Sequence, residues 1–215
     1  MFYTEKEVQI VLTTEMLGTV PKDPEIYKNY IESKKPVDVT ENESTTVEKI
    51  EEKGWTGFHR DPVSNMLFIY DYMIRGFLKS AGEVLQQNIT VEKEKKGVIS
   101  NEKLKGIKGK IDKYVFVFPR HIFLGKEAPD GVVERPLRAM TMQGPRVTLA
   151  RSDYVNAGTR LNFTIKLLKN KEIGWDIITD LLKYGELAGL GQFRNGSYGR
   201  FMVERFKDVL QDKLS

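Results

Sequence analysis

Cysteine is absent from the 215-residue sequence, and its absence excludes several chemistries at once. Without it there are no disulfide bonds, no thiolate nucleophiles and no cysteine-ligated zinc, which suits a reducing cytosol. Long apolar runs are also missing, since none approaches the roughly 20 residues that a transmembrane helix needs. Charged residues interrupt the opening MFYTEKEVQIVL, which argues against a secretory signal there. We therefore expect a cytoplasmic protein that does not engage a membrane.

Histidine is scarce, with His59 and His121 as its two occurrences. Neither the His-x-x-x-His spacing nor a cluster of carboxylates at ligand spacing occurs, so we expect no metal and no cofactor. Serine and threonine lack the sequence contexts of known nucleophiles, and the Walker phosphate loop is missing. Because an imidazole titrates near neutral pH, His59 and His121 are the candidates for a catalytic base.

Charge is present in quantity but is unevenly distributed. Residues 1–54 carry a net charge of −5 and residues 55–215 a net charge of +9, which gives +4 overall. Within the basic part, residues 92–113 hold eight lysines and four acidic residues. Such a stretch can follow a phosphate backbone, because ammonium groups neutralise phosphates without reading bases. A solvated surface loop has the same composition, and both interpretations stay open.

Hydrophobic periodicity indicates an α+β protein. Apolar residues at helical spacing predict a helix over 71–87, the clearest such pattern in the chain. YVFVFP at 114–119 predicts a strand that is covered on both faces. With 40% hydrophobic residues, the chain can bury a substantial core, and an antiparallel sheet with packed helices fits the element order best. The other expected elements are strands at 6–14, 146–155, 159–168 and from Phe201, and helices at 23–35, 47–53 and 172–184.

Residues 185–200 form the sharpest local feature, GELAGLGQFRNGSYGR. Five glycines in fifteen residues permit positive backbone dihedrals, and their amides can face an anion. Cationic, amide and aromatic side chains are interleaved with them, a combination that suits single-stranded RNA or a nucleotide. A helix C-cap followed by a bulged turn is the purely structural alternative. The candidate binding residues in this segment are Gln192, Phe193, Arg194, Asn195, Ser197, Tyr198 and Arg200.

A second cationic cluster lies in ERPLRAMTMQGPR, which we expect to be a loop. Arg138 is its candidate nucleic-acid-binding residue, with Arg135 and Arg146 beside it. Ordinary solvation of a loop is the alternative. Trp55 and Trp175 are more readily explained as core residues than as base-stacking platforms.

The tail LLKYGELAGLGQFRNGSYGRFMVERF resembles the glycine-rich C-terminal motif of the RAMP superfamily, which supplies backbone subunits of CRISPR complexes. HRDPVSN at 59–65 with the following LFIYDYMIRGFLKSAGEVL is similar to another family pattern, an Arg-Asp-Pro turn, a strand and a helix start. NAGT at 156–159 and the opening VQIVLTTEMLGT also match in order. The chain departs from the family at 71–76, where DYMIRG stands in place of small residues.

The resemblance implies a fold and a set of contacts. The fold is a single RAMP-type ferredoxin-like (βαββαβ) domain over 1–215, an antiparallel sheet with helices on one face and insertions at 36–54 and 92–111. The implied RNA contacts are residues 15–19, Arg75 with Lys79, and residues 192–200.

The chain also resembles a group of stand-alone proteins encoded in bacterial phages and prophages. We therefore predict a non-catalytic RNA-binding protein that acts, in a bacterial host cytoplasm, on a ribonucleoprotein of CRISPR type or on a defence system. One alternative is a binder that sequesters a small cyclic or linear nucleotide. A second is a Cas6-like, metal-independent endoribonuclease, and a third is a subunit that self-associates into an oligomer.

Overall fold

The structure is a computed structural model that describes residues 2–22, 55–87, 90–95, 98–103, 105–141 and 144–209. The helices expected at 23–35 and 47–53, and the insertion expected at 36–54, lie outside these residues. Among the described helices, none has the length and apolar character that a membrane span requires.

A four-stranded antiparallel sheet forms the centre of the molecule. Its order is β14-β1-β13-β9, with β1 at Tyr3–Leu12, β9 at Val115–Phe118, β13 at Arg160–Leu168 and β14 at Phe201–Asp208. Side chains alternate across β1, so Val8, Ile10 and Leu12 are buried on one face. This alternation confirms the strand expected near residues 6–14.

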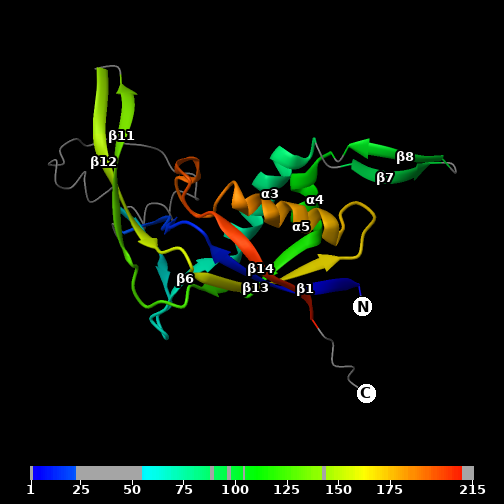
Figure 1. The fold of residues 1–215 in the computed structure, drawn as a ribbon, viewed down its shortest axis with the longest axis horizontal. Helices are drawn as coiled ribbons and strands as arrows, with labels where there is room; N and C mark the ends of the chain where they lie inside the picture. Colours follow the sequence, from blue (N-terminus) through cyan, green and yellow to red (C-terminus); the bar gives the residue numbers. More distant parts are fainter. Residues whose placement is uncertain are drawn as a thin grey trace, which may run out of the picture.

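Three helices cover that buried face (Figure 1): α3 (Asp71–Leu85), α4 (Ile107–Tyr114) and α5 (Trp175–Lys183). Phe77 of α3 packs against Phe201 of β14, and Leu181 of α5 belongs to the same core. Along the chain the order is β1, α3, β9, β13, α5, β14, and the sheet order places the fourth strand beside the first. The predicted α+β, ferredoxin-like βαββαβ fold, with its helices on one face, is confirmed.

Two smaller sheets extend this body. One has the order β10-β6-β5, from His121–Phe123, Leu67–Tyr70 and His59–Arg60. The other has the order β11-β12-β4-β3, from Gly131–Thr141, Gly144–Val155, Trp55–Gly57 and Val20–Pro21, and β2 (Met16–Leu17) pairs with β12. The long β11–β12 hairpin projects from the body in Figure 1. A separate hairpin, β7 (Thr90–Lys95) with β8 (Val98–Lys103), lies toward the opposite end of the view.

Several sequence expectations about individual segments are wrong. ERPLRAMTMQGPR belongs largely to β11 and β12 rather than to a loop, because the two strands pair from Gly131 to Tyr154. Strand β9 is covered on one face only: Phe116 is 37% exposed and Phe118 is 46% exposed. The physical reason is that β9 is an edge strand and the helices occupy a single side of its sheet. Within 92–113, most residues form β7, β8 and α4, and the insertion at 92–111 stays a prediction.

Candidate nucleic-acid interface

The glycine-rich loop is locked against the segment that follows β1. The backbone N–H of Gly199 donates to the carbonyl of Glu15 at 2.7 Å, and the N–H of Thr13 donates to the carbonyl of Arg200 at 2.8 Å. The Thr14 hydroxyl donates to the Ser197 carbonyl at 2.9 Å and accepts from the Arg200 N–H at 2.9 Å. Two of the three implied RNA contacts, residues 15–19 and 192–200, are therefore joined by hydrogen bonds into one surface.

Backbone packing explains several of the loop's glycines. A Cβ at Gly189 would lie 2.0 Å from the Tyr198 carbonyl oxygen, and one at Gly199 would lie 1.9 Å from the Leu190 carbonyl oxygen. The amides of Leu190, Gly199 and Arg200 already donate to acceptors within the protein. The expectation that the loop's amides face an anion is wrong for these three, and side chains must supply the positive charge.

Those side chains divide between two sides of the loop. On one side, a groove of about 330 Å³ separates the loop from α3. Arg194, Asn195 and Arg200 line it, and α3 supplies part of its opposite wall. Among the described residues, neither arginine forms an ion pair, and the buried Nε of Arg200 has no hydrogen-bond partner. The remaining lining residues are Phe77, Ser80, Ala81, Val84, Tyr184, Leu187 and Ala188.

On the other side, the loop meets the base of the β11–β12 hairpin. The Gln192 side-chain oxygen accepts from the Thr56 hydroxyl at 2.9 Å and from the Ser152 hydroxyl at 3.0 Å. Arg135 donates to the same Ser152 hydroxyl at 3.0 Å, and its guanidinium lies 4.5 Å from the centre of the Phe193 ring. Gln192 is thus held by the protein, whereas the Phe193 ring remains 45% exposed.

Arg135 is the functional candidate whose place the sequence did not reveal. It is only 8% exposed, its Nε has no hydrogen-bond partner, and no carboxylate in the described part of the chain pairs with it. Burial lowers the pKa of Arg135, and the charge of Tyr198 opposes that shift more weakly. A buried cation without a counter-ion is costly, so this environment favours an anion nearby.

Backbone strain accompanies the exposed aromatic residue of the loop. Phe193 has a φ of 54°, in the left-handed region that bulky residues seldom occupy. Its ring lies where a Cβ on Gly196 would be, at 2.2 Å, and 6.0 Å from the ring of Tyr198. Ser197 is also left-handed, with a φ of 68°. Strain of this kind concentrates at binding sites, where the surrounding packing maintains it.

Two predicted residues, Arg75 and Lys79, are not brought to the loop. Arg75 and Lys79 both contact Asp112 of α4, at 3.1 Å and 3.0 Å, and neither lines the groove. Arg138 lies on β11 opposite Val147, three residues along the strand from Arg135. The Asp112 carboxylate offsets one of the two positive charges of this α3 pair, which the unpaired arginines of the loop do not share.

The two histidines lie on the small β10-β6-β5 sheet, His59 on β5 and His121 on β10. Their rings stack against Phe68, with centroid distances of 5.4 Å for His59 and 4.1 Å for His121. His121 Nδ1 lies 3.9 Å from a carboxylate oxygen of Asp61. In the described part of the chain, no group of acidic and histidine side chains could hold a metal ion.

Half-burial of His59 makes a pH-dependent contribution to stability. Burial lowers the pKa of His59 below its ordinary value of 6.5, and the neighbouring His121 lowers it further. Protonation therefore favours the unfolded state, so stability falls as pH decreases from about 6.5 toward the folded-state pKa. We expect urea midpoints measured between about pH 8 and pH 5 to fall less in a His59→Gln variant than in the wild type. If the urea midpoints of the two proteins fell equally with pH, His59 would not be the source of the pH dependence.

Comparison with known proteins supports the fold. No family model matches the chain, and no curated protein matches it. Among solved structures, a chain of the cryo-EM structure of the Type III-B Cmr-beta bound to cognate target RNA matches with a TM-score of 0.51 and 15% sequence identity. The match covers 96% of this chain and 61% of that chain, so the protein spans less than two thirds of this neighbour's length. At this identity the likeness concerns architecture alone, and it agrees with the ferredoxin-like βαββαβ fold.

Proposed function

We propose that the protein is a non-catalytic RNA-binding protein that holds single-stranded RNA along its glycine-rich loop. One observation carries the proposal. In the described part of the chain, Arg194 and Arg200 of the loop and Arg135 beside it have no carboxylate partner. Elsewhere, Arg151 is paired with Glu134 at 2.8 Å and Arg160 with Glu204 at 2.7 Å, whereas these three arginines gather at one loop. Cations left unpaired at a strained, rigidly held loop are suited to phosphates.

The accompanying side chains favour RNA over an isolated phosphate. Phe193 presents an exposed ring on which an unpaired base can stack, and Arg135 supports the ring from beneath. Asn195 lines the groove beside the arginines and can hydrogen-bond a ribose hydroxyl. The structural neighbour is one chain of an assembly that is described as bound to cognate target RNA.

A small-nucleotide binder is the second candidate, and the size of the groove favours it. A volume of about 330 Å³ lies at the lower end of the range for ligand pockets, which suits one nucleotide better than a long strand. The endoribonuclease alternative with His59 or His121, the phage origin, the action on a host ribonucleoprotein or defence system, and self-association stay predictions.

Salt dependence distinguishes RNA from a nucleotide. We expect a single-stranded RNA of about 20 nucleotides to bind at low salt, with a log–log salt slope of about −2 from three phosphate contacts. Failure to bind any such RNA at low salt would refute the proposal. Displacement of the RNA by an equimolar mononucleotide, with a shallow salt slope, would favour the second candidate.

Incubation with RNA in the absence of metal tests the non-catalytic role. RNA recovered uncut supports that role. Cleavage by the wild-type protein that is lost in a His59→Gln or His121→Gln variant would contradict it.

A further inference from the structure

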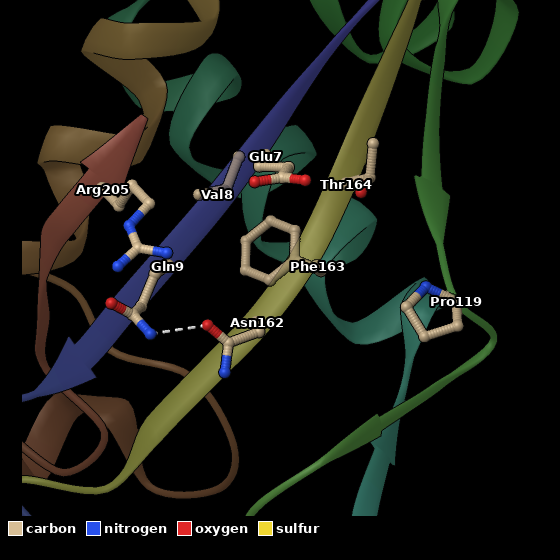
Figure 2. A pocket seen from close by; sticks show the side chains of 8 residues that line it. All are labelled: Glu7, Val8, Gln9, Pro119, Asn162, Phe163, Thr164 and Arg205. Carbon is tan, nitrogen blue, oxygen red and sulfur yellow. Dashed lines mark hydrogen bonds between the residues drawn. The ribbon is translucent and has the colours of Figure 1, made fainter. Parts of the chain in front are cut away.

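The four-stranded sheet has a second face, opposite the helices, and polar residues form ordered rows across it. Strand register places Arg205, Gln9 and Asn162 side by side on β14, β1 and β13. In the next row Glu7 lies opposite Thr164, and Thr164 lies opposite Phe118 of β9. The close-up in Figure 2 shows the side chains of Glu7, Gln9, Asn162 and Arg205 above the strands.

These rows border a shallow pocket of about 210 Å³. Val8 and Phe163 border it through the sheet backbone, because their side chains are buried in the core on the helix-covered face, and Pro119, just after β9, lies on one side in Figure 2. A cavity of this size accommodates one flat heterocycle rather than a complete nucleotide. Phe118 stands beside Thr164 with nearly half of its surface exposed, and the Lys166 ammonium lies 5.1 Å from its ring centre. An exposed aromatic face of this kind suits a stacked base.

The hydrogen-bonding groups of the pocket are only partly used within the protein. Gln9 donates from Nε2 to Oδ1 of Asn162 at 2.7 Å, which fixes both amides and leaves the Asn162 Nδ2 hydrogens for a ligand. Glu7 forms no ion pair with any described residue, although the neighbouring Glu5 pairs with Lys166 at 3.1 Å. Strand register places Lys207 of β14 opposite Glu7, but the structure shows no ion pair between them, so the exposed Glu7 carboxylate is open to hydrogen bonds from a ligand.

We propose that this pocket binds a single unpaired guanine of the RNA, an inference that rests on the proposed function. Guanine is the base whose Watson–Crick edge presents two adjacent N–H donors, N1–H and N2–H₂, which a carboxylate accepts together. Glu7 takes that edge. Asn162 and Arg205 donate to O6 and N7 on the other side of the ring, where arginine recognises guanine well. The site lies about 13 Å along β14 from the end of the glycine-rich loop at Phe201, within reach of the same strand.

Inosine tests the contact directly, because it is guanosine without the N2 amino group of the base. The probes are three uridine-rich RNAs of about 20 nucleotides that carry guanosine, inosine or adenosine at the same positions. For the wild-type protein, we expect the guanosine RNA to bind about tenfold more tightly than the inosine RNA. In Glu7→Gln this ratio is expected to fall to about one. Glu127→Gln makes the same charge change at an exposed site elsewhere and is expected to keep the ratio.

The outcomes separate this inference from the proposed function. RNA binding without any preference for guanosine over inosine would overturn the guanine site and leave the loop as the RNA-binding element. A preference that survives in Glu7→Gln would also overturn it. Absence of binding to all three RNAs would refute both proposals. Thermal unfolding of Glu7→Gln at the wild-type temperature confirms that a lost preference does not arise from misfolding.

Discussion

Replacement of Gly199 by alanine is expected to destabilise the protein by about 3 kcal/mol and to abolish RNA binding. The added Cβ would lie 1.9 Å from the Leu190 carbonyl oxygen, and the φ of 73° disfavours any side chain at this position. The backbone must therefore move. Two backbone hydrogen bonds hold it in place, from the N–H of Leu190 to the Gly199 carbonyl and from the N–H of Gly199 to the Glu15 carbonyl. Any displacement here breaks the contact between the loop and the segment after β1.

Two further glycines provide matched controls for the denaturation experiment. Gly158 has a φ of 86°, but no atom lies within 4 Å of the position that an added methyl group would take, so Gly158→Ala isolates the cost of the backbone conformation, about 1 kcal/mol. Gly109 lies within α4 with open space around it, and Gly109→Ala is expected to stabilise by up to about 1 kcal/mol. A Gly199→Ala variant no less stable than Gly158→Ala would mean that the loop is not rigidly packed.

Local pattern in the sequence was sufficient for the central sheet and two of its helices. Alternation in β1 and helical spacing in α3 report burial on one face, because each element packs against a single core. The same patterns could not show that β9 is an edge strand, since large apolar side chains occur on both of its faces. The lysine-rich β7–β8 hairpin lacked any apolar alternation that would have distinguished it from a loop.

The candidate interface was predictable in its residues but not in its geometry. The interleaving of Arg194, Asn195 and Arg200 with glycines marked the correct loop, and no local signal indicated that Gln192 and Arg194 face different sides of it. Arg135 reaches Phe193 across 58 positions of sequence, through a hairpin whose register depends on long-range pairing. Such a contact follows from tertiary structure, and the cost of burying Arg135 becomes visible only there.

Removal of both groove arginines, in Arg194→Ala with Arg200→Ala, is expected to weaken RNA binding about a hundredfold at low salt. It should also reduce the magnitude of the log–log salt slope by about 1.4, because two phosphate contacts are lost. The preference for guanosine over inosine is expected to persist in this variant, since these arginines contact phosphates rather than bases. Fluorescence anisotropy across a salt series measures the affinity and the slope together, and unfolding curves of the variant exclude loss of the fold.

The paired cations of α3 supply the control that decides where RNA lies. Arg75→Ala with Lys79→Ala removes the same charge, but these side chains already contact Asp112 and do not line the groove. If the strand follows the loop, this variant keeps a slope close to that of the wild type, since side chains that touch no phosphate release no counter-ions from the RNA. If the strand instead follows α3, as the family resemblance implies, its slope falls as far as that of the loop variant. Equal losses in the two variants would therefore show that RNA displaces Asp112 from Arg75 and Lys79, and that the binding surface extends over both elements.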